Sequence, residues 1–281
     1  MPASVKAISP GHISGYFSRI MGETPEGTGS IGAGLVIAEG VTATVERSDE
    51  TEIVVVADGV ETDGSPPIEE ALERIGVSAQ VRTESRLPIG SGFGLSAASL
   101  LATVIAADEL FTLSMGMPEI ARLAHEIEVL HGNGLGDVSA ELGGGLVCRN
   151  APGIKGVNCR LMVVEIPVAI VSLSPISTQQ VLSSPESMEK AALAYPGRFP
   201  DDINDFFAIS RQFAESSGLI TDPVRTILSA CDDANVPASM TMLGEGVFAC
   251  GYKAAGVLSQ FGRVYATSVA DEGPKIIEVN Q

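Results

Sequence analysis

Basic residues are scarce in this 281-residue chain, which carries 17 lysines and arginines against 35 aspartates and glutamates and has a formal net charge of −18. Such a surface repels nucleic acid and anionic membranes, so neither is expected as a partner. An anionic ligand must instead be attracted locally. The acidic residues are spread along the chain, which is typical of a solvated surface; adaptation to a salt-rich cytoplasm is a second interpretation.

Signals for a zinc site and for membrane insertion are also missing. The four cysteines show no C-x-x-C spacing and do not cluster with the three histidines, so no zinc site is expected. Their apolar neighbours predict buried, reduced thiols. No charged segment followed by an apolar stretch opens the chain, and the longest apolar run is about half of a membrane span. We therefore expect a cytoplasmic protein.

A glycine-rich segment, LPIGSGFGLSAA at residues 87–98, is the strongest local signal. Gly90, Gly92 and Gly94 let the backbone turn successive N–H groups toward an anion. Ser96 stands where the N-cap of a helix over 97–110 is expected, and the positive end of that helix dipole faces the loop. A strand-like run precedes the loop, and no Gly-Lys-Ser/Thr follows, so this is not a Walker A loop. The pattern predicts a triphosphate site; the alternative is a simple turn.

The helix predicted over 118–131 places its carboxylates on different faces. At about 100° per residue, Glu126 lies on the solvent side four residues after Arg122, whereas Glu128 and His125 flank the apolar stripe. Glu128 is therefore a candidate ligand for Mg²⁺, the alternative being a partly buried helix carboxylate. His125 could donate to a substrate or be a satisfied buried histidine. His131, at the end of the stripe, is expected to cap the helix.

The remaining pattern predicts an α+β chain in two parts. The boundary is expected near residue 160, giving domains 1–160 and 161–281. Further predicted helices are 68–75, 187–194, 201–217 and 223–235. Predicted strands are 5–8, 33–38, 41–47, 52–57, 79–85, 146–148, 161–172 (interrupted by a proline), 238–242, 247–252 and 263–268.

The segment PIGSGFGLSAAS resembles the second signature of the GHMP kinases, a superfamily of small-molecule kinases. Residues 9–17 resemble the first signature and residues 240–249 a divergent third, in the right order across nearly the whole chain. Phe93 replaces the usual leucine, and Leu95 replaces the first of two paired serines. The resemblance implies a two-lobed α+β fold with an N-terminal ATP-binding lobe, and use of ATP and Mg²⁺. It assigns Ser96 and Glu128 to catalysis and the metal, and nucleotide binding to Pro88, Gly90, Ser91, Gly92, Phe93, Gly94, Leu95, Ser96 and Ala97.

Residues 124–129 (AHEIEV) and 134–138 (GLGDV), together with the GFGLSA loop, resemble the archaeal pantoate kinases within that superfamily. This implies phosphorylation of D-pantoate to 4-phosphopantoate on the route to coenzyme A. Asp137 stands at the position of the family's catalytic aspartate, where it would accept or orient the proton of the substrate hydroxyl. The alternative is a capping aspartate in a glycine turn. Some members of the superfamily lack this aspartate.

A carboxylate substrate needs a cation, and Arg149 is the favoured candidate because it follows a strand just beyond Asp137. Arg19 and Arg86 are rivals. Hydroxyls of Ser30 and Thr178 are further candidates for the substrate pocket, as is His125. His12, within the first signature, receives no chemical role.

Two other functions are considered. Another GHMP activity, of the homoserine or mevalonate kinase type, is disfavoured by Leu95 and by the turn that carries Asp137. A non-catalytic metabolite-binding relative is disfavoured because Ser96, Glu128 and Asp137 are all present. The expected partners are a small-molecule substrate and a second copy in a homodimer, although the sequence carries no direct information on oligomeric state.

Overall fold

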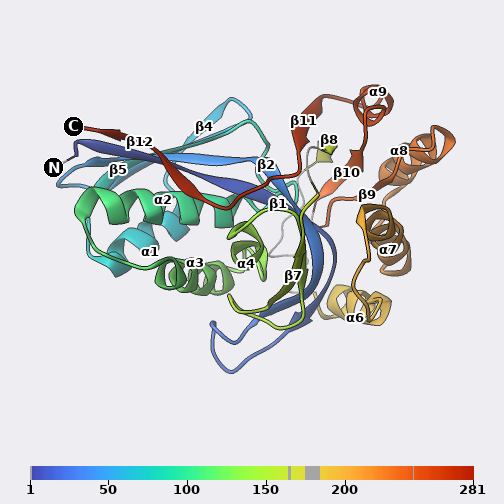
Figure 1. Ribbon diagram of the computed structural model, residues 1–281, viewed down its shortest axis with the longest axis horizontal. Helices are drawn as coiled ribbons and strands as arrows, with labels where there is room; N and C mark the ends of the chain where they lie inside the picture. The colour runs from blue at the N-terminus through green and yellow to red at the C-terminus, as the bar shows by residue number, and fades with distance from the viewer. Residues whose placement is uncertain (1, 164–165, 175–183, 243) are drawn as a thin grey trace.

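Two β-sheets with helices packed against them form the protein in the computed structural model, which describes residues 2–163, 166–174, 184–242 and 244–281. The larger sheet has eight strands and the smaller has four. Figure 1 shows the two lobes side by side, with a long strand pair of the larger sheet extending from the first lobe to the helices of the second. This is the α+β, two-lobed fold that the sequence predicts.

The long strand pair consists of β1 (Ser4–Ile20) and β2 (Gly29–Arg47), which run antiparallel over almost their whole length. Both are longer than predicted: the strand expected at 5–8 continues to residue 20, and the strands expected at 33–38 and 41–47 are one. The register shifts between Pro10 and Gly11, opposite Gly40. Such an irregularity bends a ribbon without ending it, so the two strands predicted at 33–38 and 41–47 continue through Gly40 as one strand.

The larger sheet has the order β12-β1-β2-β5-β3-β4, and β6 and β7 extend it from β2. Its further strands are β3 (Glu52–Ala57), β4 (Val60–Asp63), β5 (Ala79–Ser85), β6 (Leu146–Arg149), β7 (Val157–Leu161) and β12 (Lys275–Asn280). β12 was not predicted; it pairs with β1 and brings the two termini together (Figure 1). The division of the chain near residue 160 stays a prediction.

Helices α2 (Leu95–Phe111) and α4 (Asp137–Glu141) pack on this sheet, and α1 (Pro66–Ile75) and α3 (Met117–His131) pack against α2 and against each other. Two predicted helix caps are wrong. The N-cap of α2 is Gly94, with φ 67°, so Ser96 lies inside the first turn. The C-cap of α3 is Gly132, whose left-handed φ of 66° suits a residue without Cβ. The ring of His131 instead contacts Glu70 at 2.6 Å.

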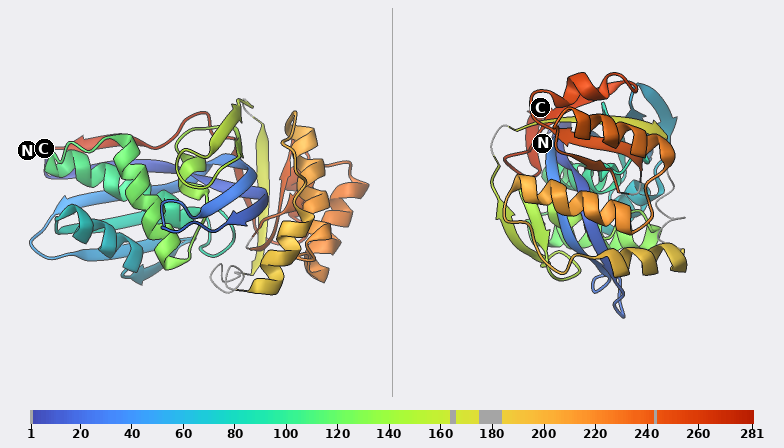
Figure 2. Two further views of the ribbon diagram at one scale, coloured as in Figure 1. Left: turned by 90° about the horizontal axis from the view of Figure 1, so that it is seen from below. Right: turned by 90° about the vertical axis from the view of Figure 1, so that its right-hand side faces the viewer.

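The smaller sheet has the order β11-β8-β10-β9, and its helices stack at one end of the molecule (Figure 2). The elements are β8 (Pro167–Ser174), α6 (Pro185–Ala194), α7 (Ile203–Ser216), α8 (Asp222–Asp233), β9 (Ala238–Met240), β10 (Glu245–Cys250), α9 (Ala254–Leu258) and β11 (Val264–Ser268). The strand expected over 161–172 corresponds to β8 from Pro167 onward, whereas Leu161 ends β7. Pro167 opens β8, where its missing N–H is tolerated. Among the described residues, no helix has the length and apolarity needed to cross a bilayer.

Candidate nucleotide and substrate site

The glycine-rich loop joins β5 to α2 and has the backbone conformation that its spacing predicts. Gly90, Gly92 and Gly94 have φ values of 77°, 80° and 67°. A Cβ on Gly92 would lie 2.4 Å from the carbonyl oxygen of Met242, and one on Gly94 would lie 2.4 Å from Oε1 of Glu141. The left-handed backbone and the close approach both require glycine here.

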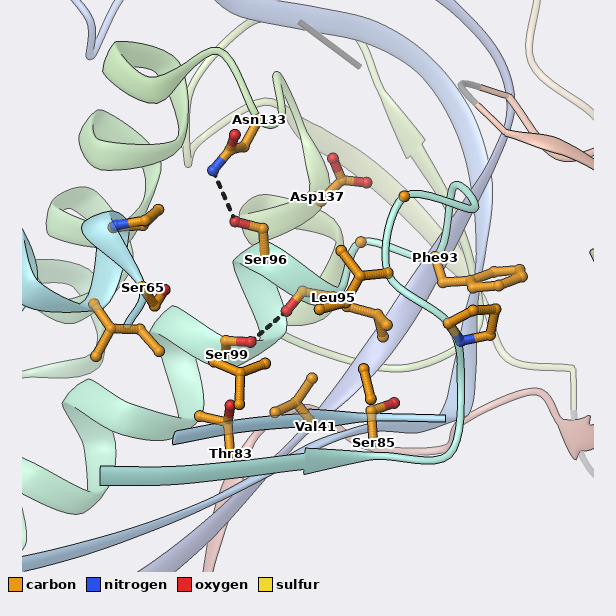
Figure 3. A pocket seen from close by; sticks show the side chains of 18 of the residues that line it. Val41, Ser65, Thr83, Ser85, Phe93, Leu95, Ser96, Ser99, Asn133 and Asp137 are labelled. Carbon is orange, nitrogen blue, oxygen red and sulfur yellow. Dashed lines mark hydrogen bonds between the residues drawn. The ribbon is translucent and has the colours of Figure 1, made fainter. Parts of the chain in front are cut away.

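A cavity of about 450 Å³ opens beside this loop. Its walls come from β3, β5, the start of α1 and the first turn of α2, and Figure 3 shows Ser65, Thr83 and Ser96 on three of these walls. The predicted loop residues that line it are Pro88, Gly90, Gly92, Phe93, Gly94, Leu95 and Ser96. Two predicted residues do not line it: Ser91 is buried and accepts a hydrogen bond from Ser172 at 2.8 Å, and Ala97 is fully buried in α2. The wall at Ser65 was not anticipated from the sequence.

Ser96, Glu128 and Asn133 form a polar cluster at the inner end of the cavity. The Ser96 hydroxyl donates to Oε1 of Glu128 at 2.5 Å, and the Asn133 amide donates to Oγ of Ser96 at 3.1 Å (Figure 3 draws the second bond). Glu128 is only 2% exposed, and burial raises the pKa of its carboxyl to about 8. Within the described part of the chain no cation pairs with it, so the cluster offers hard oxygen ligands without a counter-charge.

The helical-face prediction for α3 is confirmed in its geometry. Glu128 is buried, whereas Glu126 lies at the surface, paired with Arg122 at 2.8 Å and with Arg74 at 3.2 Å. The two carboxylates are separated by only two positions, and the helix directs them into opposite environments.

Asp137 is the first residue of α4 and points its two carboxylate oxygens in different directions. Oδ1 lies 2.7 Å from Nδ1 of His12. A Cβ on Gly134 would lie 2.8 Å from Oδ2 and 2.5 Å from Oε2 of Glu128, so Gly134 leaves open a space that both carboxylates face. Burial raises the pKa of Asp137, but the hydrogen bond from His12 and the charge of Arg149 outweigh it and hold the pKa below its usual value.

A second, small cavity also borders Asp137 and is lined by Ser14, Phe17, Ser30, Leu135, Gly136, Asp137 and Arg149. The Arg149 side chain is almost fully buried, and its Nε and Nη1 have no hydrogen-bond partner within the described part of the chain. Of the three candidate arginines, Arg149 is the one that lines this cavity. Arg86 is 74% exposed and pairs with Glu39 at the surface. Ser30 lines the same cavity as Arg149, as expected if both residues belong to the substrate pocket.

The other substrate candidates are placed differently. His125 lines neither cavity; it is buried, and its Nε2 lies 2.9 Å from the carbonyl oxygen of Thr28, which is the satisfied-histidine alternative. Thr178 lies outside the described residues. Glu141, which had no role in the sequence-based prediction, is fully buried, and burial raises the pKa of its carboxyl well above the usual value.

His12 is the residue of this site that the sequence did not reveal. Its side chain contacts Asp137, and its backbone N–H donates to the carbonyl oxygen of Phe93 in the glycine loop at 3.0 Å. His12 and Asp137 are 125 positions apart, so neither periodicity nor local spacing could pair them. The only sequence signal was the position of His12 inside the first signature.

Comparisons with known proteins agree with this geometry. Residues 67–145 match the family model described as GHMP kinases N terminal domain. A pantoate kinase of Methanospirillum hungatei is 45% identical over 97% of this chain and 96% of its own length, and a pantoate kinase of Thermococcus kodakarensis is 32% identical over 87% of each. A solved structure titled "Phosphotransferase related to CoA biosynthesis pathway" matches with a TM-score of 0.82 and 26% identity, covering 98% of both chains.

The fold and the site thus define a GHMP kinase, a class of small-molecule kinases that use ATP. Within that class, the chain belongs to the pantoate kinase family.

Proposed function

We propose that this protein transfers the γ-phosphoryl group of ATP to the C4 hydroxyl of D-pantoate and forms 4-phosphopantoate for coenzyme A synthesis. The observation that carries the proposal is the position of Asp137, which lines both the large cavity beside the glycine loop and the small cavity at Arg149. A nucleotide in the first and an alcohol in the second would meet at this carboxylate. The close similarity to curated pantoate kinases supports pantoate as that alcohol.

The nucleotide side would use the glycine loop and the N-terminus of α2 for the phosphates, since backbone N–H groups at such a terminus favour an anion. Ser96 and Glu128 would hold Mg²⁺, which supplies charge neutralisation on the β- and γ-phosphates when bound. These two residues suit a cation because the buried Glu128 carboxylate lies 2.5 Å from the Ser96 hydroxyl and has no basic partner among the described residues.

The substrate side suits the chemistry of pantoate, which has a carboxylate at one end, a hydroxyl at the other and a dimethyl carbon between them. Arg149 would bind the carboxylate, because its guanidinium is buried with two nitrogens that lack hydrogen-bond partners among the described residues. The Ser30 hydroxyl lies in the same cavity, and Phe17 and Leu135 give it an apolar wall for the methyl groups. Roles for His125 and Thr178 stay predictions.

Asp137 would orient the C4 hydroxyl and accept its proton as the oxygen attacks the γ-phosphorus. Its lowered pKa keeps the carboxylate ionised at neutral pH, which both tasks require. A cytoplasmic location and a homodimeric assembly also stay predictions.

The test is a coupled assay for ADP with D-pantoate, homoserine, mevalonate and galactose as acceptors, with and without Mg²⁺, followed by ³¹P NMR of the product. We expect Mg²⁺-dependent turnover with D-pantoate and a phosphomonoester on C4. Phosphorylation of another acceptor in the panel, or of pantothenate, with pantoate inert, would overturn the proposal. Asp137→Asn is the matched control for ATP hydrolysis by a contaminant.

A further inference from the structure

His12 contacts both halves of the site, and its position on β1 depends on a glycine in the neighbouring strand. The imidazole is fully buried. A Cβ on Gly34 of β2 would lie 2.2 Å from Nε2 of His12, so the ring occupies space that only glycine leaves free. The backbone of His12 holds the glycine loop at Phe93, and its side chain holds Asp137. One residue thereby ties the loop to the carboxylate.

The surroundings of the ring determine which nitrogen carries the proton. Burial lowers the pKa of His12, and Arg149 and Arg160 lower it further, whereas the hydrogen bond to Asp137 opposes them. The ring is therefore neutral at physiological pH and carries one proton. Because the partner of Nδ1 is a carboxylate oxygen, that proton must lie on Nδ1. Nε2 has no hydrogen-bond partner in the described part of the chain, in keeping with this assignment.

We propose that His12 is a positioning residue that donates its Nδ1–H to Oδ1 of Asp137 and thereby leaves Oδ2 directed at the reacting hydroxyl. Oδ2 lies on the side of Gly134 and Glu128, which is the side of the nucleotide cavity. A neutral donor fixes the carboxylate without adding a positive charge to the site. The inference deepens the proposed function and rests on it for the identity of the hydroxyl.

The kinetic test compares His12→Ala with His12→Asn, whose side-chain amide can place an N–H near the position of Nδ1. We expect His12→Ala to lower kcat about 10- to 100-fold, the usual effect of losing a hydrogen bond to a charged group, with KM for pantoate and ATP within about threefold. His12→Asn should recover a large part of the lost turnover. His131→Asn is the matched control and should keep wild-type turnover, because the His131 side chain lines neither cavity and contacts Glu70 of α1.

Three kinetic results would overturn the inference. Wild-type kcat in His12→Ala would show that Asp137 needs no partner. An equal loss of kcat in the Ala and Asn variants would show that the donated N–H is not what matters, provided that thermal denaturation shows both variants to be folded and both bind ATP. A loss confined to KM for pantoate would make His12 a binding residue instead.

A second measurement needs no substrate. The chain has three histidines, so the ¹⁵N ring signals of His12 can be assigned by comparison with His12→Asn. We expect a protonated Nδ1 and an unprotonated Nε2 at neutral pH; the opposite tautomer would overturn the inference. A wild-type enzyme inactive on pantoate would contradict the proposed function alone, and the tautomer would still decide the role of His12.

Discussion

Replacing Arg149 by methionine should weaken substrate binding and leave the fold at least as stable. Arg149 is 1% exposed, and two of its three guanidinium nitrogens have no hydrogen-bond partner among the described residues. A buried polar group in that state costs about 1–3 kcal/mol, a cost that an anionic ligand would remove. Methionine fills a similar volume without a charge, and such replacements of buried ions are often neutral or stabilising.

The magnitude follows from the bond that would be lost. A hydrogen bond to a charged group contributes about 1.5–3 kcal/mol, which corresponds to an increase of about 10- to 150-fold in KM for pantoate. KM for ATP should change little, because Arg149 does not line the nucleotide cavity. Thermal denaturation without ligand should give a melting temperature equal to or above that of the wild type.

The matched control is Arg86→Met, because Arg86 is an exposed arginine paired with Glu39 at the surface. Pairs of this kind contribute little to stability, so neither KM nor the melting temperature should change appreciably. An unchanged KM for pantoate in Arg149→Met would refute the assignment of the carboxylate site. A large loss of stability with normal KM would show that Arg149 is a structural residue whose partner has been overlooked.

Three further predictions concern the carboxylates and the loop. Glu128→Gln should lower turnover and raise the Mg²⁺ concentration required, whereas Glu126→Gln should have little effect; equal effects in a Mg²⁺ titration would contradict the geometry of α3. Gly92→Val should abolish the ATP binding that calorimetry measures, because the valine Cβ would meet the carbonyl oxygen of Met242 and the backbone of Gly92 has a φ of 80°. Asp137→Asn should lower kcat by about 100-fold or more with a similar KM for pantoate. The folded state lowers the pKa of Asp137, so kcat of the wild-type enzyme should stay constant as the pH falls to the usual aspartate pKa and should decline only below it. A decline of kcat that begins at or above the usual aspartate pKa would contradict this prediction.

Local sequence was enough to predict the glycine loop and the faces of the helices beside it. The glycine loop, the helix after it and the separation of Glu126 from Glu128 all depend on residues within one or two turns of each other. Backbone preferences and helical periodicity act over that range, so they can be read from residue order. The chemical roles of these residues stay predictions until the variants are measured.

Tertiary packing decided the rest. Choosing Arg149 over Arg19 and Arg86 required knowing which guanidinium lines the cavity beside Asp137. The contact between His12 and Asp137, and the pairing of β12 with β1, join segments from distant parts of the chain. These contacts depend on where the β1–β2 ribbon bends and on what packs against it, and no local pattern encodes that. The sequence by itself therefore determined the loop and the orientation of its helix neighbours, while the fold determined which distant side chains meet at the Asp137 carboxylate.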